Sequence, residues 1–113
     1  MREILFRGKD IYGKWHYGDL INLTSEIKQI CNHAMLEHAH SVNPDTVGQY
    51  TGVADRNGNR IFEGDIVKDK TFLGVVLYDN SEGRFYVDLG ADTSSLWCDF
   101  EIIGNIHDNP DIV

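Results

Sequence analysis

Short apolar runs separated by glycine and polar turns alternate along most of the chain. These runs are rich in β-branched and aromatic residues, which predicts strands rather than helices. The expected strands lie at residues 4–8, 15–21, 46–52, 61–62, 66–68, 74–78, 84–89 and 100–106. Many short strands with close glycine turns are typical of a mostly β protein, and we expect a small antiparallel β barrel or sandwich.

Residues 24–40 depart from this pattern. Apolar side chains recur there at helical spacing, namely at Ile27, Ile30, Cys31, Ala34 and Met35. That spacing predicts a short amphipathic helix near residues 25–38. Asn32 and His33 equally fit a turn between two short strands. The fold class is therefore mostly β, with α+β as the alternative.

The clearest turn signal follows the middle strand. Asn57-Gly58 is the strongest hairpin signal in the chain, because both residues suit a tight loop between paired strands. It predicts a two-residue loop with Gly58 at positive φ.

The C-terminal half is expected to form a sheet of its own. Its strands follow one another with polar loops between them, so neighbours should pair antiparallel. Alternation predicts one inward face made of Val75, Leu77, Phe85 and Val87, with Phe85 in the core. The apolar residues of the last strand, at 102–106, would return to close this sheet into an SH3-like barrel.

Length and composition point to a single domain covering residues 1–113. No apolar run approaches the roughly 18 residues that a membrane-spanning helix needs. The N-terminus shows no charged-then-apolar leader, so we expect a cytoplasmic protein. Cys31 and Cys98 are too few for a disulfide framework and are expected to be free.

The formal net charge is −8, and most of it lies in the last third of the chain. Residues 79–113 hold eight acidic residues, and Arg84 is their single base. A domain that binds a nucleic-acid duplex normally carries a basic patch, so nucleic acid is an unexpected partner. The acidity serves solubility, or it forms a surface for a basic partner.

Four residues of the types that bind zinc cluster in the N-terminal half: Cys31, His33, His38 and His40. Structural zinc takes four such ligands in a tetrahedron. On a helix, however, Cys31 and His38 would share one face while the other two lie on another. No C-x-x-C or H-x-x-x-H pair is present, so we expect neither a metal nor another cofactor.

Nothing in the chain predicts a catalytic site. Glu63 and Asp65 are close carboxylates, but a polar bend before a strand explains them better than acid–base catalysis. We therefore expect no enzyme. The same two acids, with the aromatic residues Trp15, Tyr17 and Tyr50, form the candidate interaction surface, because aromatic rings on a sheet face can stack on a partner.

Several turn and strand motifs combine in a specific pattern. They are residues 46–52 (TVGQYTG), Asp55, Asn57-Gly58 and residues 61–67 (IFEGDIV). Together they resemble the signature of the YopX family, which occurs in bacteriophages and prophages. Residues 2–8, 14–20 and 101–110 resemble that family's opening, second strand and ending. The resemblance implies a phage origin and a β-rich fold, without an established activity, and residues 21–41 fall in a variable stretch.

We therefore expect a phage accessory protein that acts by binding a host or phage protein. One alternative is an acidic inhibitor that occupies a basic site on a host nucleic-acid enzyme. Another is a weak nucleic-acid-binding β module, with a basic rim around the N-terminal aromatic residues formed by Arg2, Arg7, Lys9 and Lys14. Strand edges and abundant aromatic residues also predict a homo-oligomer.

Overall fold

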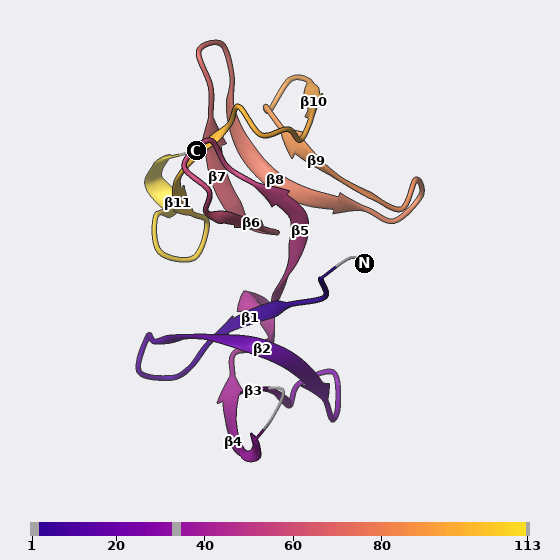
Figure 1. Cartoon of the computed structure of the whole chain (residues 1–113), viewed down its shortest axis with the longest axis vertical. Coiled ribbons are helices and arrows are strands. Elements are labelled where there is room, and N and C mark those ends of the chain that lie inside the picture. The colour runs from indigo at the N-terminus through magenta and orange to yellow at the C-terminus, as the bar shows by residue number, and fades with distance from the viewer. Residues whose placement is uncertain (1–2, 33–34, 113) are drawn as a thin grey trace. The chain divides into compact units, whose positions relative to one another are not determined.

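The computed structural model describes residues 3–32 and 35–112. Strands dominate, and the described helical segments are two short 3-10 helices, so the prediction of a mostly β chain is confirmed. The chain divides into two compact units, Met1–Tyr50 and Thr51–Val113 (Figure 1). Within the described ranges, no helix is long and apolar enough to cross a membrane.

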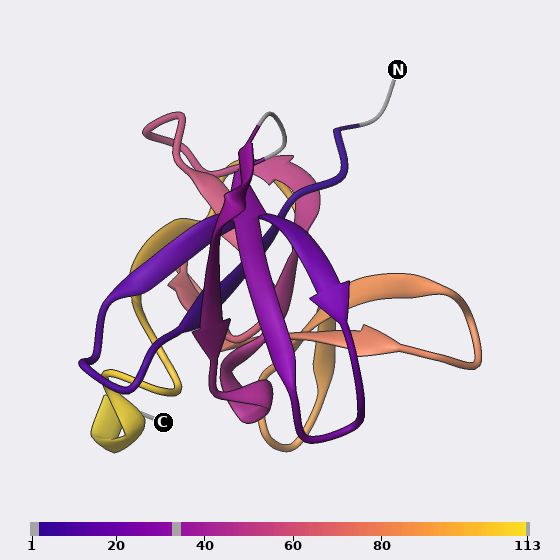
Figure 2. The ribbon, with the colours of Figure 1, turned by 90° about the horizontal axis from the view of Figure 1, so that it is seen from below.

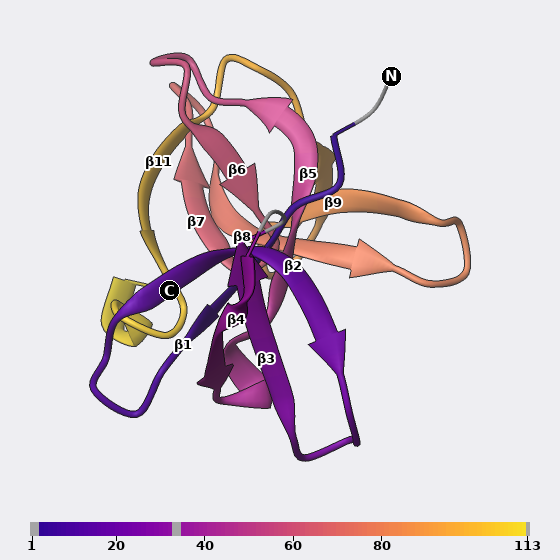
Figure 3. The same ribbon diagram turned by 60° about the horizontal axis from the view of Figure 1, so that its bottom comes forward.

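The N-terminal unit is built on antiparallel strands that pair in the order β4-β3-β2-β1-β5. They are β1 (Phe6–Lys9), β2 (Trp15–Asn22), β3 (Lys28–Asn32), β4 (Met35–Val42) and the start of β5 (Gly48–Ala54), and the 3-10 helix η1 (Pro44–Thr46) precedes β5. A loop at residues 23–27 joins β2 to β3 (Figures 2 and 3). Strand β5 continues across Thr51 into the second unit.

The predicted helix near residues 25–38 is wrong, because β3 and β4 form an antiparallel pair there. β3 has β2 on its other side, so its backbone is hydrogen-bonded to two neighbours. Ile30 and Cys31 are both buried, and the ladder shifts register between Ile30 and Asn32. Because the strand is irregular, the adjacent residues Ile30 and Cys31 are both buried, and this produced the spacing that we interpreted as helical. The alternative of two short strands is confirmed, although residues 33–34 lie outside the described residues.

The C-terminal unit contains a five-stranded antiparallel sheet in the order β10-β9-β8-β7-β11. After the end of β5 come β6 (Arg60–Phe62), β7 (Asp65–Lys68), β8 (Leu73–Asp79), β9 (Arg84–Asp88), β10 (Thr93–Ser95), β11 (Glu101–Asn105) and the 3-10 helix η2 (Pro110–Ile112). The core of this unit consists of fully buried side chains from β6, β7, β8, β9 and the segment before β11: Ile61, Val67, Val76, Val87 and Phe100. The β8–β9 hairpin extends outward from it (Figure 3).

The five-stranded sheet is not closed into a barrel. As expected, the last strand joins the sheet, because β11 pairs with β7. The SH3-like closure is not found, since β10 and β11 are the two edges of the sheet and no described pairing joins them. β10 has only three residues, and the chain after it turns inward to place Phe100 in the core. That segment therefore fills the core and does not extend the ladder.

The antiparallel pairing of β7, β8 and β9 is confirmed, but the inward face predicted for β8 was displaced by one residue. Val76 is fully buried opposite Val87, whereas Val75 and Leu77 are half-buried. Phe85 is partly buried and packs against the core. Strand β8 is an unbroken apolar run, so alternation of residue types cannot assign its two faces.

The loop between β5 and β6 places Gly58 at a φ of 85°, as predicted. The connection covers residues 55–59, however, and is not a two-residue loop. The amide of Gly58 donates to the Asp55 carbonyl at 3.0 Å, and the Asp55 amide donates to the Asn59 carbonyl at 2.7 Å. No atom lies within 4 Å of a Cβ built on Gly58, so its backbone angle, and not space, calls for glycine.

We predict that Val76→Ala lowers the free energy of unfolding by about 2 kcal/mol, because it removes two buried methyl groups and leaves a cavity. Val75→Ala, at the neighbouring half-buried position, should cost clearly less. Urea denaturation followed by circular dichroism measures both. Equal costs, or a larger cost at Val75, would contradict the register described for β8.

Candidate functional site

The residues predicted to form an interaction surface fall in both units. Trp15, Tyr17 and Tyr50 belong to the N-terminal unit, and Glu63 and Asp65 belong to the C-terminal unit. Tyr17 is exposed on β2, whereas Trp15 and Tyr50 are half-buried. Tyr17 is therefore the most accessible of the three aromatic residues.

Cations contact the Trp15 ring. The guanidinium carbon of Arg7 lies 4.7 Å from the ring centre, and the Lys9 ammonium lies 5.9 Å from it. Arg7 itself is buried. Cation–π attraction therefore engages two of the four residues expected to form a basic rim. Of the other two, Lys14 is exposed, and Arg2 lies outside the described residues.

The loop between β1 and β2 exposes two large apolar side chains. Ile11 and Tyr12 are each 87% exposed. Asp10 holds the loop: its Oδ1 accepts the amides of Tyr12 and Lys14, both at 2.9 Å, and its Oδ2 lies 2.8 Å from His16 Nε2. The hydrogen bond with His16, supported by the Lys14 amide, lowers the pKa of Asp10, so the carboxylate stays ionised.

Sequence reasoning missed this exposed pair. The available signal was two large apolar residues inside a turn bounded by aspartate and glycine. Turn residues are normally polar, so such a pair at a hairpin tip is itself a departure from the expected pattern.

The two predicted acidic residues lie at the turn between β6 and β7. Asp65 is 2% exposed, and its Oδ2 accepts the Phe62 amide at 2.7 Å. Gly64 between them donates its amide to the Val76 carbonyl at 2.8 Å and accepts the Ile106 amide at 3.0 Å. Asp65 therefore holds a buried turn, which matches the interpretation of this segment as a polar bend. Glu63 is half-buried.

Asp55 is the second buried carboxylate of the C-terminal unit. It is 5% exposed; its Oδ1 accepts the amides of Asn57 and Asn59, both at 2.9 Å, and its Oδ2 accepts the Ile102 amide at 3.1 Å. Burial by itself raises the pKa of Asp55, but the hydrogen bonds from Ile102, Asn59 and Asn57 together outweigh it and hold the pKa below its ordinary value of 3.8. The side chain is therefore an ionised structural acceptor.

The candidate zinc ligands differ in accessibility. Cys31 is buried on β3, and His38 and His40 are exposed on β4. The His40 ring stacks on that of His16, with ring centres 4.0 Å apart. His33 lies outside the described residues. In the part of the chain that the structure describes, no group of three or more His, Cys, Asp or Glu side chains is placed to hold a metal ion.

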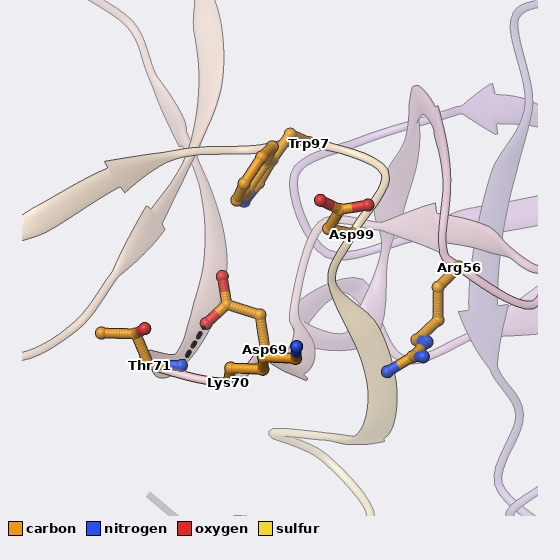
Figure 4. A pocket seen from close by; sticks show the side chains of 6 residues that line it. All are labelled: Arg56, Asp69, Lys70, Thr71, Trp97 and Asp99. Carbon is orange, nitrogen blue, oxygen red and sulfur yellow. Dashed lines mark hydrogen bonds between the residues drawn. The ribbon is translucent and has the colours of Figure 1, made fainter.

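A pocket of about 570 Å³ opens in the C-terminal unit (Figure 4). Its lining residues come from the β5–β6 loop, the β7–β8 loop and the segment between β10 and β11: Arg56, Asp69, Lys70, Thr71, Trp97 and Asp99. Asp69 orders the β7–β8 loop, because its Oδ1 accepts the amides of Thr71 at 2.8 Å and Phe72 at 2.7 Å. Sequence reasoning missed this pocket, since three separated loops form it and no motif spans them.

The family model described as YopX protein matches residues 5–113, nearly the whole chain. The chain belongs to the YopX family. Among solved structures, protein EF1440 from Enterococcus faecalis is similar to this YopX chain, with 21% sequence identity, a TM-score of 0.59 and 99% of each chain covered. That similarity concerns the fold alone. No curated protein matches this chain.

The motifs that resembled the YopX signature hold turns in this structure. Asp55 and Asp65 accept backbone amides, and Gly58 adopts a positive φ. Gly64 is hydrogen-bonded to Val76 in β8 and to Ile106, which follows β11. These residues position the β5–β6 and β6–β7 connections of the YopX fold. The motif residues Asp55, Gly58, Gly64 and Asp65 therefore serve the fold in this structure.

We predict that Asp55→Asn lowers the free energy of unfolding at neutral pH by about 2–3 kcal/mol, the range for hydrogen bonds to a buried charged group. The amide keeps one acceptor oxygen but presents an NH₂ group to backbone donors. Chemical denaturation of the full chain measures the loss. Asp111→Asn, an exposed acid in the same unit, is the matched control and should be neutral.

The effect of Asp55 on stability should also depend on pH with a defined sign. Its folded pKa lies below 3.8, so its contribution is present above the unfolded pKa and is lost as the pH falls through the folded value. The difference in stability between the wild type and Asp55→Asn should therefore shrink at acid pH. A difference that stays constant with pH would show that the ionised carboxylate is not responsible.

We predict that the fold needs no zinc. Excess chelator should leave the melting temperature unchanged, because a structural zinc contributes directly to folding free energy. Elemental analysis of the purified protein provides the second measurement. Stoichiometric zinc, or a lower melting temperature with chelator, would overturn this prediction.

Proposed function

We propose that this YopX-family chain is a phage accessory protein that acts by binding a host or phage protein, and not by catalysis. The exposed pair Ile11-Tyr12 carries the proposal, because both side chains stand almost fully in solvent at the tip of the β1–β2 loop. The occurrence of the family in bacteriophages and prophages supports the proposed origin. The construction of this loop supports the proposed binding role.

An ordered loop makes this pair effective for binding. The Asp10 carboxylate joins the loop backbone to His16, and Gly13 takes a positive φ of 82°. Side chains presented by an ordered loop lose less conformational entropy on association than those of a flexible one. Tyrosine is enriched among the residues that dominate binding energy at protein interfaces. The loop therefore supports contact with a complementary apolar recess on another protein.

The carboxylates near the family motif support binding over catalysis. A general acid or base must reach the substrate and needs a pKa near the working pH. Asp55 and Asp65 are buried and accept backbone amides, and the lowered pKa of Asp55 keeps it ionised. Both carboxylates therefore serve the fold.

Charge favours a protein partner over a nucleic-acid duplex. The C-terminal unit holds twelve acidic and five basic residues, and the N-terminal unit holds six acidic and five basic residues. Duplex binding draws on a surface rich in cations. Arg7 and Lys9 lie over the ring of Trp15, and that ring is half-buried.

A second candidate is an acidic inhibitor of a host nucleic-acid enzyme. The excess of seven negative charges in the C-terminal unit favours it, because such a field steers a protein toward a basic site. Its inhibition of an isolated nuclease or polymerase would weaken steeply as salt is raised. Inhibition that does not respond to salt would contradict this candidate.

We predict that Ile11→Ser/Tyr12→Ser loses its partner without losing the fold. The full chain, immobilised, is used to capture proteins from host lysate, and each captured protein is then purified and titrated against it by calorimetry. The double variant should bind at least tenfold more weakly, on the scale of a binding hot spot. Its melting temperature should not fall, because neither side chain packs in the core.

The matched control is Leu23→Ser/Ile27→Ser, which removes two exposed apolar side chains from the β2–β3 loop of the same unit. It should keep the affinity of the wild type. Sedimentation of both variants tests whether the partner is a second copy of the chain. Equal binding by the wild type and by Ile11→Ser/Tyr12→Ser would overturn the assignment of the binding loop, and turnover of a substrate would overturn the binding role.

A further inference from the structure

The pocket of the C-terminal unit is lined by two of the five basic residues of that unit. Arg56 and Lys70 are exposed, and neither side chain forms an ion pair or hydrogen bond with any residue that the structure describes. In the same unit, Arg84 is paired with Glu82 at 2.8 Å. Two unpaired cations that face one opening provide a local site for an anion.

An indole forms another wall of this pocket. Trp97 is 50% exposed, and its ring makes an edge contact with the buried Phe100, with ring centres 6.3 Å apart and planes at 81°. The contact with a core residue anchors Trp97 while half of its surface stays open. An anchored, open aromatic ring is a platform on which a planar ligand can stack.

Backbone hydrogen bonds hold the walls in place. The Arg56 amide donates to the Phe100 carbonyl at 2.9 Å, and the Phe100 amide donates to the Trp97 carbonyl at 3.4 Å. The β7–β8 loop, which carries Lys70, is held by the Asp69 carboxylate. A site formed by ordered loops requires little rearrangement when it binds a ligand.

The two acids of the pocket have different environments. Asp69 accepts two loop amides through its Oδ1, whereas Asp99 is exposed and has no hydrogen-bond or ion-pair partner among the described residues. In Figure 4, Asp99 lies on the same side of the pocket as Trp97, and the nitrogens of Lys70 and Arg56 lie opposite. A free carboxylate beside an aromatic ring accepts hydrogen bonds from hydroxyl groups of a sugar.

We propose that this pocket binds a nucleoside phosphate. The base stacks on Trp97, the phosphate lies between Arg56 and Lys70, and Asp99 accepts from the sugar hydroxyls. The volume of about 570 Å³ is in the range of small-molecule sites. A free nucleotide and the end of a single-stranded nucleic acid offer the same chemistry. The proposal is independent of the partner-binding loop, which belongs to the other unit.

Calorimetry on the full chain tests the proposal with four probes at constant ionic strength: adenosine 5′-monophosphate, adenosine, inorganic phosphate and a short single-stranded adenine oligonucleotide. The nucleotide should bind saturably and more tightly than adenosine or phosphate alone, because only it engages both the ring and the cations. If the oligonucleotide binds more tightly than the free nucleotide, a strand is the source; the reverse order identifies a free nucleotide.

Variants of the lining residues locate the site. Arg56→Ala and Lys70→Ala should each weaken nucleotide binding about tenfold, the loss of one charge-assisted hydrogen bond. Lys68→Ala is the matched control, an exposed lysine on the adjacent strand that does not line the pocket. Trp97→Phe should retain binding while removing the ligand-induced change in tryptophan fluorescence. Circular dichroism confirms that each variant is folded.

Three results would overturn the proposal. The first is the absence of saturable binding by both the nucleotide and the oligonucleotide. The second is equal affinity for phosphate and nucleotide, which would exclude stacking on Trp97. The third is nucleotide binding that Arg56→Ala, Lys70→Ala and Lys68→Ala leave equally unchanged, which would place the ligand elsewhere.

Discussion

Backbone amides from two distant parts of the chain converge on the carboxylate of Asp55. One oxygen receives the amides of the β5–β6 loop, and the other receives that of Ile102 in β11. The next residue, Arg56, adds a backbone hydrogen bond to Phe100, whose ring is in the core. Removing this acceptor would leave several amides unsatisfied, which is costly where water is excluded. This carboxylate therefore joins the β5–β6 loop to the edge strand β11.

The same type of interaction recurs at smaller scale along the chain. In several turns an aspartate side chain accepts the amide two residues later; the aspartates are Asp10, Asp55, Asp69, Asp79 and Asp88. For Asp79, the hydrogen bonds from the side chain and amide of Ser81 lower the pKa. Part of the net charge of −8 therefore reflects turn chemistry and not a partner's charge. Composition alone is for this reason a weak guide to what the protein binds.

Features fixed by local chemistry could be predicted from the sequence, and features that depend on distant contacts could not. Most strands and the positive φ of Gly58 follow from residue type, because β-branched runs and glycine turns act locally. The prediction of a helix near residues 25–38 was wrong because β3 pairs with β2, and the spacing of apolar residues carries no information about such a distant partner. The prediction of the inward face of β8 was wrong because Val75 and Val76 are equally apolar, so residue type cannot distinguish them. The pocket could not be found, since three loops meet there.

Both candidate sites combine an ordered loop with an exposed ring, but they differ in chemistry. At the β1–β2 loop, Asp10 orders the backbone, and the exposed side chains of Ile11 and Tyr12 are apolar. At the pocket, Asp69 orders one wall, while Arg56 and Lys70 stay unpaired among the described residues. A surface of the first kind gains free energy by burying apolar area, and one of the second kind gains it from charge and stacking. In each loop the aspartate orders the backbone and so fixes the position of the neighbouring side chains, which are the ones proposed to recognise a ligand.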